Sequence, residues 1–209
     1  MSLGFPSAYG DLLSAWRDGV KRETGRSAAA FLILMVLTCV GCLLIPGLLD
    51  LLSGVMGNLT VDLDAVTDES GNLSALAVFV SNLQATTFIM LYGLLPFVQL
   101  PAMALGLNAV LLGWLAAGYV RNGLSLALYL AALIPHAIFE LPAMMLAFGV
   151  GLYTCGQLTR RLRGNEETRS VTGCLSLMGQ TLLLALAPLL LAAAFVEAYV
   201  TPAIAAWFL

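Results

Sequence analysis

Charged side chains are scarce in this chain: Asp, Glu, Lys and Arg make up only 10% of its 209 residues, and there is a single histidine. With a pI of about 5.0 and a formal net charge of −3, the chain lacks a basic surface that would attract phosphates. Apolar residues make up 60%, and the mean hydropathy is +0.95. These values exclude a soluble enzyme, a nucleic-acid-binding protein and a disordered chain, and they predict an integral membrane protein.

The few charges that exist are clustered. Seven lie within residues 1–26, five within residues 50–69 and six within residues 160–169, which leaves Arg121, Glu140 and Glu197 as isolated charges. The uncharged stretches between these clusters are continuously apolar and long enough for helices of about 20 residues, the length that crosses a bilayer. The sequence therefore predicts an all-α fold, a polytopic bundle of transmembrane helices.

We expect five spans in one transmembrane domain over residues 27–209, at about residues 27–49, 76–96, 102–120, 135–158 and 171–193. Residues 124–134 are too short to cross alone, so they predict an interfacial or re-entrant segment on the outer side. Residues 1–26 carry apolar side chains at helical spacing among charged ones. They predict an amphipathic helix that either lies on the inner membrane surface or packs on the bundle as a cap.

The distribution of lysine and arginine predicts the orientation. Four of these residues precede the first span and four lie within residues 160–169, whereas the acidic segment 50–69 contains none. Basic segments stay on the cytoplasmic side of a membrane. We therefore expect a cytoplasmic N-terminus and, with five crossings, a C-terminus outside.

A small set of polar residues in or beside the apolar stretches requires explanation, because such groups are costly in lipid and face protein or water. They are His136, Glu140, Glu197, Asn82 and Asn108. His136 and Glu140 are four residues apart, so on a helix they share one face and can hydrogen-bond directly. In a five-span arrangement Asn82, His136, Glu140 and Glu197 all fall toward the outer leaflet, which predicts an intramembrane polar cluster.

Three roles for this cluster remain open from the residues alone. It can be a structural contact between helices, a proton- or ion-coupling site of a transporter, or a site for a divalent metal such as zinc. The metal candidates are His136, Glu140 and Glu197, with Asn82 or water as a fourth ligand. Pro135 and Pro142 flank the first two of these residues and predict a locally irregular helix there.

Other chemistry is poorly represented in the sequence. Cys39, Cys42, Cys155 and Cys174 lie in apolar stretches without zinc-site spacing, so we expect them to pack between helices. No nucleotide-binding loop or nucleophile constellation is present, and we expect no enzymatic activity and no cofactor apart from that metal. The glycines favour close packing within the bundle, and the alternative is the seam of a homodimer.

Two segments resemble a known family. Residues 135–143, Pro-His-Ala-Ile-Phe-Glu-Leu-Pro-Ala, are similar to the Pro-His-Gly-x-x-Glu-x-Pro-Ala signature of the stage II sporulation protein M family. Residues 192–202 resemble its C-terminal Ala-Ala-x-x-Glu-Ala-x-x-Thr-Pro, which adds Thr201 and Pro202 to the motif positions. Asn82 with Gly93, and Asn108 with Gly113, match weaker positions, and Ala137 replaces a usual glycine.

This resemblance implies a five-span protein of a prokaryotic plasma membrane. The family's namesake is a membrane anchor for partner proteins that degrade peptidoglycan during spore formation. The resemblance therefore implies a non-enzymatic scaffold with cell-wall hydrolases as partners, in contact with membrane lipid. The short predicted cytoplasmic segments agree with a scaffold. The alternatives are a transporter or ion-coupled protein that uses the polar cluster, and an intramembrane metal-binding protein or metalloenzyme.

Overall fold

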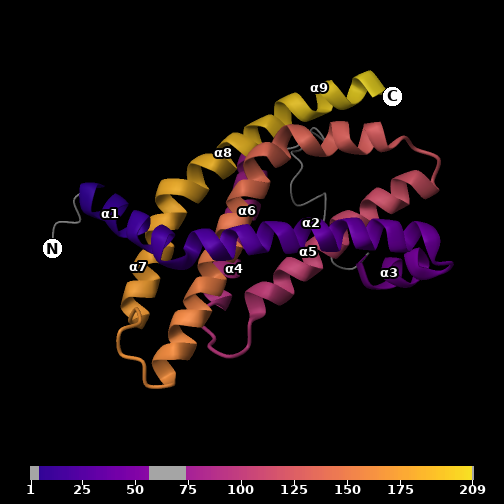
Figure 1. Cartoon of the computed structure of the whole chain (residues 1–209). Coiled ribbons are helices and arrows are strands. Elements are labelled where there is room, and N and C mark those ends of the chain that lie inside the picture. The colour runs from indigo at the N-terminus through magenta and orange to yellow at the C-terminus, as the bar shows by residue number, and fades with distance from the viewer. Residues whose placement is uncertain (1–4, 57–73, 209) are drawn as a thin grey trace. The chain divides into compact units, whose positions relative to one another are not determined.

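The computed structural model of the chain describes residues 5–56 and 74–208 (Figure 1). The structure is 87% helical, and the described residues contain no β-strand. Five helical segments are long and apolar enough to cross a membrane: Tyr9–Leu44, Ala75–Tyr92, Leu100–Arg121, Leu126–Leu162 and Val171–Ile204. The predicted all-α fold with five spans is confirmed.

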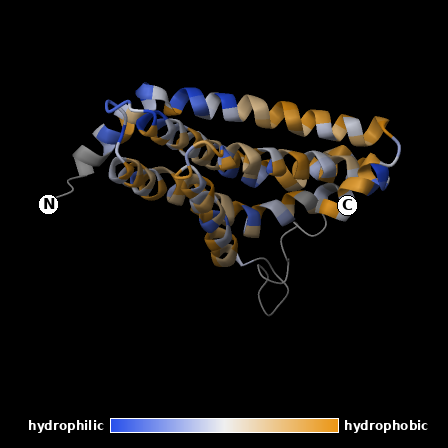
Figure 2. Ribbon diagram, turned by 90° about the horizontal axis from the view of Figure 1, so that it is seen from below, coloured by the Kyte–Doolittle hydropathy of each residue, from blue (hydrophilic) through white to orange (hydrophobic). Residues whose placement is uncertain are grey.

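The individual helices have well-defined bounds. They are α1 (Phe5–Ala15), α2 (Lys21–Leu44), α3 (Leu48–Met56), α4 (Ala75–Tyr92), α5 (Leu100–Arg121), α6 (Leu126–Leu162), α7 (Val171–Thr181), α8 (Ala187–Phe195) and α9 (Thr201–Ala205). Figure 2 shows hydrophilic colour over the first turns of α2 and hydrophobic colour over the rest of it. The charges of this helix therefore gather at one end, as expected where a helix enters a membrane.

The chain forms two compact units. Unit 1 comprises Met1–Ala28, Asn82–Leu105 and Leu141–Leu190, and unit 2 comprises Ala29–Ser81, Gly106–Glu140 and Leu191–Leu209. Each unit therefore combines segments that are far apart in the sequence. The expectation of a single transmembrane domain over residues 27–209 stays a prediction.

Unit 1 contains backbone contacts that only glycine permits. A Cβ atom on Gly93 would overlap the backbone of Gly151, and one on Gly149 would overlap Thr24. In lipid, where apolar side chains gain little by leaving the membrane, such close approach of small residues supplies much of the attraction between helices. Within unit 1, the backbone of α6 therefore approaches α2 at Thr24 and the end of α4 at Gly93.

The N-terminal helix of unit 1 is joined to the rest of that unit by polar contacts. Helix α1 packs against α7. Arg169 Nη2 donates to Asp11 Oδ1 at 2.9 Å and to Ser14 Oγ at 3.2 Å. Of the two alternatives for residues 1–26, these contacts favour a cap packed on the bundle.

A second carboxylate extends this set of contacts. Asp18 Oδ2 accepts a hydrogen bond from the Tyr153 hydroxyl at 2.5 Å and another from Gln157 Nε2 at 3.4 Å. Gln157 Oε1 in turn accepts from the Arg169 backbone N–H at 3.3 Å. Together these residues form what we call the Arg169 network: Asp11, Ser14, Asp18, Tyr153, Gln157 and Arg169.

The first span ends earlier than the predicted residue 49. Helix α2 stops at Leu44, and Pro46 and Gly47 separate it from the short helix α3. Proline cannot donate a backbone hydrogen bond, and Gly47 has a φ of 80°, a conformation that ends helices. The apolar run continues past this break, which is why hydropathy alone extended the span.

The prediction that residues 124–134 form a separate segment is wrong for residues 126–134. Helix α6 is continuous from Leu126 to Leu162, so these residues form its first turns. Pro135 lies inside the helix, where membrane proteins tolerate proline because neighbouring groups satisfy the freed carbonyl. A helix of 37 residues is about 55 Å long, more than a hydrocarbon core of about 30 Å. An interfacial position of its first turns stays a prediction.

The last span also continues beyond the predicted residue 193, to Ile204. Two π-helical turns, Leu182–Leu186 and Val196–Val200, interrupt the regular hydrogen bonding. Each lies just before a proline, Pro188 or Pro202, and the N–H before that proline bonds five residues back. Because the wider turn moves the carbonyl that the proline ring would strike, the chain stays helical through both prolines.

Candidate functional site

Helix α6 presents two of the predicted site residues on one face. His136 and Glu140 are one turn apart, with their side chains 13% and 27% exposed. The distance from His136 Nε2 to Glu140 Oε2 is 3.9 Å. This separation is that of an ion pair when the imidazole is protonated, and it exceeds hydrogen-bond length, so the expected direct hydrogen bond is absent.

Glu197 joins this pair from a distant part of the sequence. It lies in the π-helical turn Val196–Val200, the irregular turn that precedes Pro202. One ligand atom each of His136, Glu140 and Glu197 lies within 4.8 Å of the others. All three residues belong to unit 2. We call this group the triad.

Thr201 completes the surroundings of the histidine. Its side chain is buried, and Thr201 Oγ1 lies 3.4 Å from His136 Nδ1, a long hydrogen-bond distance. In Figure 1 the first turns of α6 run beside α9, which begins at Thr201. The two ring nitrogens thus have different neighbours, with Nδ1 at Thr201 and Nε2 at Glu140.

The charge of the triad is not balanced by nearby lysine or arginine. Arg121, at the end of α5, is the only such residue in the sequence of unit 2. Among the residues that the structure describes, the ion pair of the triad is the internal one between His136 and Glu140. Two carboxylates therefore share a half-buried place with one imidazole, an arrangement that requires a proton or a cation for neutrality.

The other predicted residues have different positions. Asn82 lies on α4 and belongs to unit 1, where its backbone carbonyl accepts from Thr86 Oγ1 at 2.8 Å. Its membership of the cluster stays a prediction. Asn108 is half-buried on α5 in unit 2. Pro142 is exposed on α6 in unit 1, and Pro135 lies one residue before His136.

Sequence reasoning missed the Arg169 network. Its members lie outside the longest apolar runs or toward their ends. Charged and polar side chains are common there, so they do not by themselves indicate a buried contact. Burial lowers the pKa of Arg169, but hydrogen bonds to Asp11 and Tyr153 outweigh this effect and raise it. The guanidinium is therefore held in its charged form. Asp11, Ser14 and Asp18 recur at helical spacing in the N-terminal segment. This spacing was the signal from which a polar contact on one side of that segment could have been predicted.

The five apolar helices and the polar triad within them define a multi-pass integral membrane protein. The family model of Stage II sporulation protein M matches residues 27–202, which is most of the chain and contains the whole triad. The chain belongs to this family, as the motifs around His136 and Glu197 indicate. The family is not known as a family of enzymes. No curated protein and no solved structure matches the chain.

Proposed function

We propose that the chain is a non-enzymatic membrane scaffold that anchors partner proteins, with cell-wall hydrolases as the partner class. The observation that carries this proposal is how little of the described chain lies outside the spans. Residues 93–99, 122–125 and 163–170 connect four of the five spans. Such a chain acts on other proteins through helix faces and short turns, and membership of the Stage II sporulation protein M family supports this role.

The proposal includes a location and an orientation. We place the protein in the plasma membrane of a prokaryote, with the N-terminus in the cytoplasm and the C-terminus outside. The basic segment that contains Arg160, Arg161, Arg163 and Arg169 supports this orientation, because positive charge is retained on the cytoplasmic side. Most of the acidic segment 50–69, which we expect to contribute to docking, lies outside the described residues.

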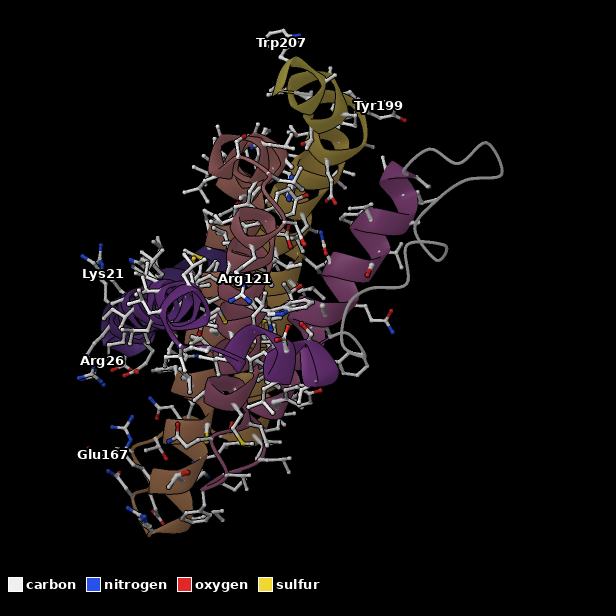
Figure 3. The ribbon with its side chains drawn as sticks, turned by 90° about the vertical axis from the view of Figure 1, so that its right-hand side faces the viewer. Lys21, Arg26, Arg121, Glu167, Tyr199 and Trp207 are labelled. Atoms are coloured by element: carbon white, nitrogen blue, oxygen red, sulfur yellow. The ribbon has the colours of Figure 1, made fainter. Side chains whose placement is uncertain are left out.

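Site-directed photo-cross-linking in living cells tests the scaffold role. Figure 3 shows Tyr199 and Trp207 on the C-terminal helical segment of unit 2, and their side chains are 61% and 83% exposed. A photoreactive residue at either position should give a cross-link to a cell-wall hydrolase, identified by mass spectrometry. Leu183, which is 72% exposed in the first half of the last span and far along the chain from both test positions, is the control.

Two outcomes would refute the scaffold. Cross-links from Tyr199 and Trp207 to lipid alone contradict partner docking, and cross-links only to a second copy of the chain indicate a homodimer instead. Orientation is tested separately by labelling cysteine at Glu167, an exposed loop position. A membrane-impermeant thiol reagent should reach Glu167→Cys only after the cells are broken.

A further inference from the structure

The triad has the geometry of a metal-binding site. A Zn²⁺ ion takes nitrogen and oxygen ligands at about 2.0 to 2.2 Å in tetrahedral geometry, so any two of its ligand atoms lie about 3.3 to 3.6 Å apart. The ligand atoms of His136, Glu140 and Glu197 already lie within 4.8 Å of one another. The three ligand atoms therefore need to approach one another by about 1 Å to enter one coordination shell, a shift within the reach of side-chain rotation.

The charges of the triad favour a divalent cation over a proton. Glu140 and Glu197 together carry two negative charges when ionised, and no lysine or arginine pairs with them among the described residues. A shared proton removes one of these charges, whereas a divalent cation balances both. The single imidazole favours a transition metal, because calcium and magnesium prefer oxygen ligands alone.

Thr201 provides a second and independent indication. A histidine that ligates a metal usually forms a hydrogen bond through its other ring nitrogen, which fixes the ring orientation. Thr201 Oγ1 lies 3.4 Å from Nδ1 of His136, and Nε2 is the nitrogen directed toward Glu140. The buried Thr201 therefore lies beside the ring nitrogen at which such an orienting group is required.

We propose that His136 Nε2 and one carboxylate oxygen each from Glu140 and Glu197 bind one divalent transition-metal ion, with Zn²⁺ as the preferred ion. This ion joins α6 to the π-helical turn Val196–Val200 within unit 2. Water fills the remaining coordination position. Thr201 is a positioning residue that holds the imidazole ring. The proposal is independent of the scaffold role, since a metal clamp stabilises the protein whether or not a partner binds.

Metal content and metal-dependent stability test the proposal in the full-length protein in detergent. Protein purified without chelator should contain about one zinc per chain by elemental analysis. After removal of the metal with EDTA, added Zn²⁺ should raise the midpoint of thermal unfolding, as any ligand specific to the folded state does. Glu197→Gln should lose both the bound zinc and the shift. Glu167→Gln, at an exposed loop carboxylate, should retain both.

Thr201 gives a graded test. Thr201→Val should weaken zinc affinity by roughly 10- to 100-fold, the usual effect of losing an orienting partner. Thr201→Ser keeps the hydroxyl and should bind like the wild type. A merely structural threonine would lower the stability of the metal-free protein without changing the zinc affinity, and that result would remove Thr201 from the proposal.

If Glu197→Gln fails to fold, metal binding can be tested with the wild-type protein alone. Metal-free wild type titrated with Co²⁺ should develop the visible absorption bands of a tetrahedral site at one equivalent. Absence of these bands together with absence of a Zn²⁺-dependent shift would overturn the proposal. Equal zinc binding by a folded Glu197→Gln would overturn it as well. Neither result bears on cross-linking to a hydrolase, so the two proposals can fail separately.

Discussion

The Arg169 network of unit 1 and the triad of unit 2 differ in how their charges are balanced. In the Arg169 network each carboxylate has a donor of its own: Asp11 pairs with Arg169, and Asp18 accepts from Tyr153 and Gln157. In unit 2 two carboxylates share one histidine, and no lysine or arginine pairs with them among the described residues. The Arg169 network therefore pairs its carboxylates internally, whereas the triad requires a proton or a cation from outside the chain.

The largest effect is expected in unit 1 at Asp18. Asp18→Ala leaves the Tyr153 hydroxyl and the Gln157 amide without their acceptor, and both side chains belong to buried residues. The free energy of unfolding should fall by about 1 to 3 kcal/mol, the usual cost of unpaired buried polar groups. Denaturant-induced unfolding in detergent measures this. Asp18→Asn, which keeps an acceptor oxygen, should lose less, and equal losses would refute the role of the hydrogen bonds.

A smaller effect is expected at Asp11, the other carboxylate of the Arg169 network. Arg169→Met removes the contacts to Asp11 and Ser14. The ion pair is partly open to solvent, because the side chain of Arg169 is 21% exposed and that of Asp11 is 35% exposed. Because solvent screens such a pair, we expect a loss of about 1 kcal/mol. The loss should shrink at high salt. Arg160→Met is the control, since Arg160 Nε bonds only to the Gly156 carbonyl of its own helix.

The triad gives the clearest test of the comparison. Neutralising one of its carboxylates should not lower the free energy of unfolding, in contrast to the substitutions in unit 1. In chelator, Glu140→Gln relieves repulsion between Glu140 and Glu197, so its free energy of unfolding should equal that of the wild type or exceed it by up to about 1 kcal/mol. With added zinc the order should reverse. Thermal unfolding of both proteins in both solutions measures this. A variant less stable than wild type in chelator would mean that the triad balances its charges internally.

The smallest effect is expected at a neutral hydrogen bond of unit 2. Trp114 Nε1 donates to Ser53 Oγ at 3.1 Å, and Trp114→Phe removes this bond. The free energy of unfolding should fall by about 0.6 kcal/mol, a typical value for hydrogen bonds between membrane helices. If Trp114→Phe lowers the free energy of unfolding and Glu140→Gln does not, unit 2 is not simply insensitive to polar substitutions. No loss would weaken the comparison.

The fold class and part of the site follow from short-range sequence features. Clustered charges between apolar runs predict the five spans, and the spacing of His136 and Glu140 predicts their common helix face. The helix ends depend on details that hydropathy does not register. Pro46 with Gly47 ends α2 inside an apolar run, whereas Pro135, Pro188 and Pro202 leave helices unbroken. Proline removes a donor in all four cases, and its surroundings decide whether the helix continues.

The composition and the clustering of charges determined that this chain lies in a membrane, because long uncharged apolar runs are stable in lipid as helices and costly to expose to water. The cost of polar groups in lipid also marked His136, Glu140 and Glu197 as the residues to explain. Only the tertiary structure decided that Glu197 meets the other two and that Thr201 stands behind the imidazole. These contacts join positions some sixty residues apart, and no short-range pattern in the sequence relates positions at that separation.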